Sequence, residues 1–398
     1  MASKLTMSDL DFKGRRALIR VDFNVPLDKS GAITDDTRIQ SALPTIQYVL
    51  DHGGAVILMS HFGRPKGKAP EFSLAPCAKR LSELLKKPVT MAPDCIGREV
   101  EALAAKMKPG DVMLLENVRF YPAEEKPEKD PDFAKNLARL GDLYIDDAFG
   151  SAHRAHSSVV GVAKYFPGKA VPGFLMEKEI QFLGHALASP KRPFYAIIGG
   201  AKISTKIGVL GALIQKTDGI FIGGGMAFTF FKALGIPIGS SICEEEMVET
   251  AKKLIADCKE KKIPLFLPLD VVAATSFEAT ANFDTFNMSK GIPDGYQGMD
   301  IGEKTQNAWE KSLHDGRTIL WNGPVGVYEF PNFAAGTNKI AKALAGMKEA
   351  VTIAGGGETV AAINGLGLGA FFSHISTGGG ASLEYIEKGS LPGIDALG

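Results

Sequence analysis

The chain has 398 residues, more than one hydrophobic core usually supports, so two or three domains are expected and two are favoured. Its 45% hydrophobic and 23% charged residues exclude a disordered chain, a collagen and a coiled coil. The 45 lysines and arginines balance 45 acidic residues, which argues against nucleic acid and anionic membranes as partners, so any anion site must be local. Glycine is in excess, with 45 residues against a usual share of about 7%.

The cysteines and the N-terminus bear on the compartment. The 4 cysteines lie far apart without a CxxC pair, so neither a zinc knuckle nor a disulfide framework is indicated. The first residues, MASKLTMSDLDFKG, contain no apolar segment of a signal peptide, and no stretch reaches the roughly 18 apolar residues that a spanning helix needs. We therefore expect a soluble, cytoplasmic protein with reduced cysteines and no membrane partner.

Short apolar runs alternate with segments of helical period, a pattern typical of βαβ units with a parallel sheet. In the first half the pattern predicts strands at 16–21, 55–60, 112–115 and 143–145, and helices at 41–50, 74–85, 97–106 and 132–140. One helix is then predicted over 172–187. In the second half it predicts strands at 194–198, 219–222, 265–267, 318–321, 351–353 and 372–376, and helices at 203–216, 244–261 and 333–347.

A domain boundary is predicted near SPKRP (189–193), which follows the helix between the two sets of strands. The predicted domains are residues 1–171 and 190–376, with 172–189 as the helix that connects them. No short repeat and no low-complexity segment interrupts either half.

In open parallel sheets, ligands bind beyond the carboxyl ends of the strands. In the first half these positions are polar and cationic. The planar guanidinium group of arginine can bind carboxylate and phosphate oxygens through two parallel hydrogen bonds. A single arginine would more often be a surface ion pair, but the recurrence at successive strand ends favours a site for a small, multiply charged anion. The residues are Asp22-Phe23-Asn24, Arg38, His61-Phe62-Gly63-Arg64, Asn117-Val118-Arg119 and Ala152-His153-Arg154.

In the second half the same positions are rich in glycine, which lets backbone N–H groups approach a phosphate closely. Each loop alone is weak evidence, but the repetition predicts a nucleotide-binding cradle. The loops are Gly199-Gly200-Ala201-Lys202, Gly223-Gly224-Gly225, Asn322-Gly323-Pro324-Val325-Gly326, Gly355-Gly356-Gly357-Glu358-Thr359 and Thr377-Gly378-Gly379-Gly380.

Other chemistries lack their motifs. No G-x-x-x-x-G-K-[ST] occurs, and Phe228, Val360 and Leu383 stand where a G-x-G-x-x-G motif needs its last glycine, which argues against a P-loop enzyme and a dinucleotide-dependent dehydrogenase. His153 and His156 match no zinc signature, and no G-x-S-x-G elbow marks a nucleophilic serine.

Nine motifs in chain order resemble the phosphoglycerate kinase family, and the match continues to the closing LPGIDAL. They are RVDFNVP (20–26), DDTRI (35–39), SHFGRP (60–65), ENVRF (116–120), DDAFGSAHRAHSS (146–158), GGAKISTK (199–206), WNGPVGVYEF (321–330), AGGGETVAA (354–362) and STGGGASLE (376–384). The resemblance implies an α/β protein of two Rossmann-like lobes, each a parallel sheet flanked by helices, joined by a hinge helix. It also implies that the tail 377–398 packs back on the first lobe.

The resemblance implies roles for residues at the strand ends of both lobes. The first lobe would bind 3-phosphoglycerate or 1,3-bisphosphoglycerate through Asp22, Phe23, Asn24, Arg38, His61, Phe62, Gly63, Arg64, Arg119 and Arg154. The second lobe would bind ADP or ATP through Lys206, Gly223, Gly224, Gly298, Asn322, Pro324, Val327, Glu329, Gly356, Gly357, Glu358 and Thr359. Mg²⁺ would be held at Glu358.

The implied reaction is reversible, Mg²⁺-dependent transfer of the acyl phosphate of 1,3-bisphosphoglycerate to ADP, in line and after hinge closure. Such a transfer depends on positioning and on neutralisation of charge. Arg38, Lys202, Gly379 and Gly380 are the candidates for neutralisation. We expect a monomer that uses only these small molecules. The alternative is a bilobal protein that binds anions or nucleotides without catalysis.

Overall fold

The protein is described by a computed structural model of residues 5–398, with the side chains of 185 and 186 left out. The chain forms two compact units. The first comprises the chain up to Gln181 together with Ser390–Gly398, and the second is Phe182–Gly389. This division differs from the predicted one, because it falls inside the predicted connecting helix and assigns only 390–398, rather than 377–398, to the first unit.

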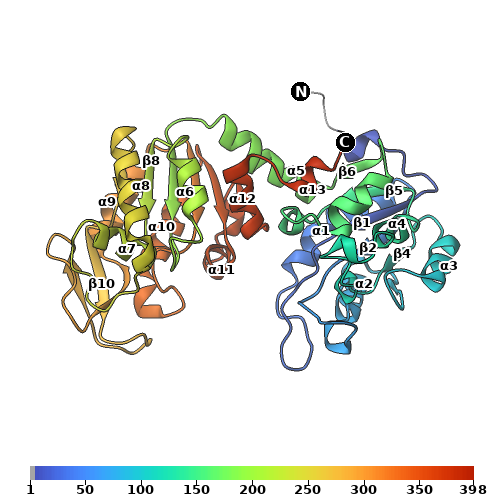
Figure 1. Ribbon diagram of the computed structural model, residues 1–398, viewed down its shortest axis with the longest axis horizontal. Helices are drawn as coiled ribbons and strands as arrows, with labels where there is room; N and C mark the ends of the chain where they lie inside the picture. Colours follow the sequence, from blue (N-terminus) through green and yellow to red (C-terminus); the bar gives the residue numbers. More distant parts are fainter. Residues whose placement is uncertain (1–4) are drawn as a thin grey trace. The chain divides into compact units, whose positions relative to one another are not determined.

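The first unit is built on a sheet of six parallel strands in the order β3-β4-β2-β1-β5-β6 (Figure 1). The four predicted strands are present, and the two that were not predicted have only two and three residues, too few for a recognisable alternation. The strands are β1 (Arg16–Arg20), β2 (Ala55–Met59), β3 (Thr90–Met91), β4 (Val112–Leu114), β5 (Leu143–Asp146) and β6 (Ala170–Pro172).

Helices cover both faces of this sheet because its strands are apolar on both sides. Alternate residues of β1 show the two layers: Ala17 and Ile19 pack with Ile46 of α1, whereas Leu18 packs with Leu137 of α4. The helices of this unit are α1 (Thr37–Asp51), α2 (Ala75–Leu85), α3 (Arg98–Lys106), α4 (Phe133–Ala138), α5 (Phe174–Glu179) and α13 (Pro392–Asp395).

The segment predicted as one helix over 172–187 is more complex. Pro172 ends β6, α5 begins at Phe174, and a π-helical segment, Ile180–Ala186, follows α5 directly. The prediction of a helix starting at Pro172 was therefore wrong at its first residues, since the backbone there is still paired with Asp146 of β5.

The second unit is built on another sheet of six parallel strands, in the order β15-β14-β13-β7-β8-β9. Trp321 of β13, Trp309 of α9 and Ile340 of α10 belong to one core on this sheet. The strands are β7 (Phe194–Ile198), β8 (Gly219–Ile222), β9 (Leu265–Phe266), β13 (Thr318–Asn322), β14 (Val351–Gly355) and β15 (His374–Ile375). The helices are α6 (Ile207–Leu213), α7 (Met226–Ala233), α8 (Val248–Glu260), α9 (Glu303–Leu313), α10 (Ala335–Ala345), α11 (Gly357–Gly365) and α12 (Gly380–Lys388).

The second unit also contains a small antiparallel sheet that the sequence analysis did not predict. Its strands are β10 (Asp270–Ala274), β11 (Phe283–Asn287) and β12 (Gln297–Ile301), in the order β11-β10-β12. The edge strand β11 is mostly exposed, so its sequence lacks the apolar run by which the buried parallel strands were recognised.

In each large sheet one strand lies where the strand order reverses. β1 has β2 on one side and β5 on the other, and β7 has β8 on one side and β13 on the other. Crevices for ligands form beyond the carboxyl ends of strands at such points. The loops after β1, β2 and β5 and those after β7, β8 and β13 are therefore the places to examine.

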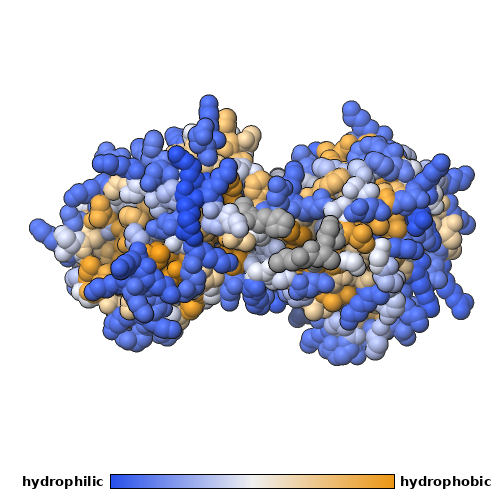
Figure 2. Space-filling model, turned by 90° about the horizontal axis from the view of Figure 1, so that it is seen from above, coloured by the Kyte–Doolittle hydropathy of each residue, from blue (hydrophilic) through white to orange (hydrophobic). Residues whose placement is uncertain are grey.

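The surface is mostly hydrophilic, as expected for a chain with an ordinary share of charged residues. Hydrophilic side chains predominate on the face of both units drawn in Figure 2, with apolar ones in scattered patches. Within residues 5–398, no helix has the length and the apolar character needed to cross a membrane.

Candidate active site

In the first unit, side chains from three strand ends are joined by hydrogen bonds. Arg38, in the first turn of α1, donates to Asp22 Oδ2 at 2.8 Å. Asn24 Oδ1 accepts from the backbone N–H of Gly63 at 2.8 Å, and Arg119 donates to the Gly63 carbonyl at 2.7 Å. The loops after β1, β2 and β4 thus meet as the sequence analysis predicted.

Arg20, the last residue of β1, is a buried cation beneath these loops and was missed in the sequence analysis. Its side chain is 1% exposed, donates to Ser158 Oγ at 2.8 Å and lies 3.2 Å from His61 Nδ1. The signal for it was present, because an arginine stood in an otherwise apolar strand directly before the polar strand end.

Burial and the neighbouring charged groups determine the charge states of Asp22 and His61. Burial by itself favours the protonated carboxyl of Asp22, but interactions with His61, Arg38 and Arg20 outweigh it and hold the pKa of Asp22 below its usual range. Burial lowers the pKa of His61 to about 3; Asp22 opposes this shift, and repulsion by Arg20 and Arg119 adds to it. His61 is therefore a neutral imidazole at physiological pH, beside an ionised carboxylate.

The charge state of His61 predicts a pH dependence of stability. An unfolded histidine takes up a proton near pH 6.5, whereas buried His61 does not until about pH 3, so it destabilises the fold increasingly as pH falls through this window. Between pH 7 and pH 5 the wild-type free energy of unfolding should fall by about 2 kcal/mol more than that of His61→Gln. Urea unfolding at both pH values measures this difference, and parallel curves would contradict it.

The remaining predicted residues of the first unit divide into two groups. The side chains of Arg64 and Arg154 are exposed, and no ion pair of either is recorded among the described residues, so both are available to an anion. Phe23 and Phe62 are buried in the apolar core instead, which leaves only their backbone at the strand ends. The Phe23 N–H already donates to Ser60 Oγ at 2.8 Å.

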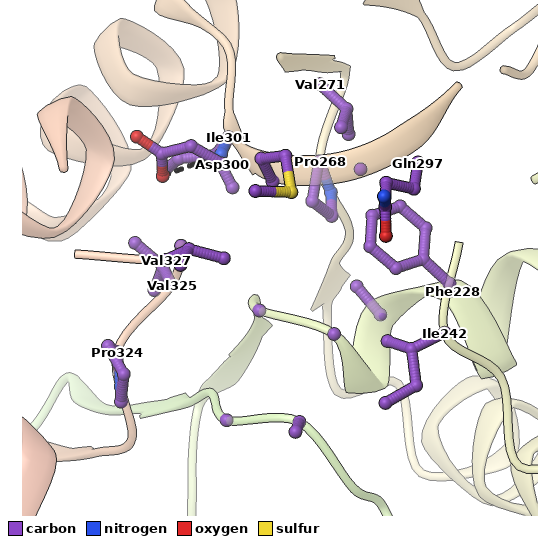
Figure 3. A pocket seen from close by; sticks show the side chains of 18 of the residues that line it. Phe228, Ile242, Pro268, Val271, Gln297, Asp300, Ile301, Pro324, Val325 and Val327 are labelled. Carbon is purple, nitrogen blue, oxygen red and sulfur yellow. Dashed lines mark hydrogen bonds between the residues drawn. The ribbon is translucent and has the colours of Figure 1, made fainter. Parts of the chain in front are cut away.

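The second unit contains an apolar cavity of about 340 Å³ beyond β7, β8 and β13. Phe228 and Ile242 lie on one side of the hollow, and Val325 and Val327 lie on the other (Figure 3). Of the residues predicted to bind nucleotide, Gly224, Gly298, Pro324, Val327, Glu329 and Glu358 line this cavity.

Two glycines of the cavity have no room for a side chain. Gly224 has a φ of +66°, and a Cβ there would lie 2.7 Å from the backbone nitrogen of Gly200. A Cβ at Gly298 would lie 1.9 Å from the Phe228 ring. Gly223 differs from these two: it is not among the residues that line the cavity, and a Cβ there would meet the Val325 side chain.

A polar cleft adjoins the apolar cavity and shares Gly200, Ala201 and Glu358 with it. α11 and α12 begin in this cleft, at Gly357 and Gly380, so two helix N-termini bring backbone N–H groups to it. The cleft is lined by the predicted residues Lys202, Lys206, Asn322, Gly356, Gly357, Glu358, Thr359, Gly379 and Gly380.

Lys206 is the less exposed of the two lysines that line this polar cleft. Its ammonium donates to Asn322 Oδ1, and Thr359 Oγ1 accepts from the Gly323 N–H at 2.7 Å, so the loops after β13 and β14 are linked. Burial lowers the pKa of Lys206 to about 8, which Glu358 partly opposes. An anion in the cleft would raise the pKa of Lys206 again, because it favours the charged ammonium.

The cleft supplies some, but not all, of the ligands that a divalent cation needs. Among residues 5–398, no cluster of three or more His, Cys, Asp and Glu side chains could hold a metal alone. Mg²⁺ in kinases is bound by one or two carboxylates together with the substrate phosphates. The exposed carboxylate of Glu358, at the start of α11, fits that mode.

A cationic set of strand ends on one α/β unit, and an apolar cavity with an adjoining glycine-lined cleft on the other, indicate a phosphotransferase for a small anionic substrate. The comparisons agree, since a family model described as Phosphoglycerate kinase matches residues 7–389. The chain belongs to the phosphoglycerate kinase family.

Individual relatives match over almost the whole chain. A cytosolic phosphoglycerate kinase of Triticum aestivum is 53% identical over 394 residues, which cover 98% of this chain and 97% of the relative. A phosphoglycerate kinase of Dictyoglomus turgidum is 54% identical over 399 residues, covering 100% and 99%. The solved structure of phosphoglycerate kinase from Coxiella burnetii is 39% identical, with a TM-score of 0.88 and 99% of both chains covered.

Proposed function

We propose that this protein is a phosphoglycerate kinase of glycolysis and gluconeogenesis. It transfers the acyl phosphate of 1,3-bisphosphoglycerate to ADP, reversibly, and forms 3-phosphoglycerate and ATP. The single observation that carries this proposal is the pairing of two unlike sites: a cationic set of strand ends in one unit, and an apolar cavity that adjoins a glycine-lined cleft in the other. Full-length family membership supports it.

In the first unit, the substrate would be held by exposed and half-buried arginines. Arg64, Arg119 and Arg154 would bind phosphate oxygens, since a guanidinium fork suits them bidentately. Asp22, Asn24 and neutral His61 would hydrogen-bond the hydroxyl and carboxyl groups of the three-carbon acid, with the backbone of Phe23, Phe62 and Gly63 shaping the loops around it.

In the second unit, adenosine would occupy the apolar cavity, with Val327 and Glu329 at its wall. Lys206, Asn322 and the N-terminus of α11 would bind the inner phosphates in the polar cleft. Glu358 would hold Mg²⁺ together with those phosphates. When bound, the metal neutralises charge on the transferred group.

The transfer itself requires little covalent chemistry from the protein, so positioning and charge neutralisation carry it. Arg38 in the first unit and Lys202 in the second are proposed to neutralise the moving phosphoryl group, with N–H groups at Gly379 and Gly380 as further donors. Hinge closure would bring the two ligands in line and exclude water that would hydrolyse an acyl phosphate.

An assay that supplies 3-phosphoglycerate and MgATP, coupled to a reductase that consumes 1,3-bisphosphoglycerate, tests this function. We expect turnover that saturates with both substrates. The alternative, a binding protein without catalysis, predicts binding of both ligands and no product. That alternative assigns no role to Lys202 or to the Gly379–Gly380 turn.

Lys206 offers a separate test of phosphate binding. In the free protein its pKa is lowered to about 8, and a phosphate beside it should raise that pKa. ADP binding at pH 8.5 should therefore take up a fraction of a proton, visible by calorimetry in buffers of different ionisation enthalpy. Lys206→Arg is the matched control, because a guanidinium stays charged and should take up none. Equal uptake in both proteins would remove Lys206 from the phosphate site.

We further propose that the protein acts as a monomer in the cytoplasm. Its relatives include a protein named cytosolic and another named chloroplastic, so the family name alone does not determine the compartment.

A further inference from the structure

Asp300 is a buried carboxylate in the wall of the apolar cavity (Figure 3). It is 3% exposed, whereas Glu329 and Glu358, the other acidic residues of that wall, are exposed. Burial raises the pKa of Asp300 to about 7. Within the part of the chain that the structure describes, Asp300 forms no ion pair. A buried carboxylate without a cation destabilises a fold, so its presence in this wall calls for a functional reason.

Both oxygens of Asp300 accept backbone hydrogen bonds. Oδ1 accepts from the N–H of Ile301 at 2.8 Å, and Oδ2 accepts from the N–H of Gly336, in the first turn of α10, at 2.7 Å. Asp300 therefore joins the end of β12 to the N-terminus of α10.

The loop after β13 packs directly against the same carboxylate. A Cβ at Gly326 would lie 2.1 Å from Asp300 Oδ1, and a Cβ at Gly336 would lie 2.4 Å from it. The same loop is attached on both sides: the Val327 N–H donates to the Met299 carbonyl at 2.8 Å, and the Val325 N–H donates to Thr337 Oγ1 at 3.2 Å. Pro324, Val325 and Val327 of this loop form one side of the cavity.

We propose that Asp300 is a positioning residue for the nucleotide: its carboxylate fixes the loop 323–327 and the start of α10 against β12, and thereby sets the width of the cavity that receives adenosine. This inference rests on the proposed function, because it assigns the cavity to adenosine. It predicts an effect on nucleotide affinity alone, since the substrate residues of the first unit are not among the groups that Asp300 contacts.

Asp300→Asn tests the inference with almost no change in volume. An amide offers one oxygen where two N–H groups need acceptors, so one of them loses its partner. We expect the KM and the Kd for ATP to rise about tenfold. kcat at saturating ATP and the KM for 3-phosphoglycerate should stay within about twofold of wild type.

Asp270→Asn is the matched control. Asp270 is also a buried carboxylate of this unit and accepts from the N–H groups of Lys304 and Thr305 at the start of α9, but it does not line the cavity. The Asp270→Asn substitution should lower the melting temperature without changing the KM for ATP. If Asp300→Asn fails to fold, Thr337→Val removes the acceptor of the Val325 N–H at nearly constant volume and should raise the KM for ATP in the same direction.

An unchanged KM for ATP in a folded Asp300→Asn protein, or an equal rise in Asp270→Asn, would overturn the inference. A wild-type protein that binds no ATP by calorimetry would instead overturn the proposed function, so the two failures are distinct.

Discussion

Arg38→Ala should lower kcat about a hundredfold or more while the Kd for ADP changes little. Arg38 lies in the first unit, where its guanidinium pairs with Asp22 and is 40% exposed, so it can reach a ligand. Removing a cation that stabilises charge in the transition state lowers kcat. The affinity for the other substrate is unchanged. Steady-state kinetics together with calorimetry of ADP binding measure both quantities.

Arg16→Ala is the control for this prediction. Arg16 begins β1, at the end opposite to the site loops, and forms an ion pair with Asp142 at 2.9 Å. Its removal should cost stability at most and leave kcat near the wild-type value. If Arg38→Ala keeps its kcat, the assignment of Arg38 to the transferred phosphoryl group is wrong.

The second large effect is expected at Gly224→Ala, which should abolish measurable ATP binding. Its backbone has a φ of +66°, and the added Cβ would lie 2.7 Å from the Gly200 nitrogen and 2.9 Å from the Pro324 carbonyl oxygen. All three residues line the apolar cavity. Because backbone cannot rotate away as a side chain does, the loops must separate and the cavity must change shape.

Gly235→Ala separates this clash from backbone strain. Gly235 has a φ of +75°, but a Cβ there meets nothing within 4 Å. It should lose about 1 kcal/mol of stability from the left-handed conformation and bind ATP normally. Equal ATP affinity in the two variants would show that the Gly224 loop does not form the nucleotide site.

The sequence was informative wherever strands are buried on both faces. The strands around β1 and β7 were predicted because their apolar runs are continuous. The rule that ligands bind beyond the carboxyl ends of parallel strands then selected the loops to examine. Polar residues such as Asp22 and Arg119 were recognisable because they interrupt such a pattern.

The residues that escaped prediction look like ordinary core residues in the sequence. Phe228 and Met299 form walls of the cavity, but nothing distinguishes an apolar residue that faces a ligand from one that faces a helix. Met299 lies moreover in β12, a strand of the small antiparallel sheet that was not predicted.

We propose that the two sites together transfer a phosphoryl group. The most direct measurement is the initial rate of ATP formation from 1,3-bisphosphoglycerate and MgADP, recorded alongside calorimetric binding of ADP and of 3-phosphoglycerate. We expect ATP formation that saturates with both substrates and that falls in Arg38→Ala without loss of ADP binding. Binding of both ligands by the wild-type protein with no ATP formed would contradict it and leave a binding protein in its place.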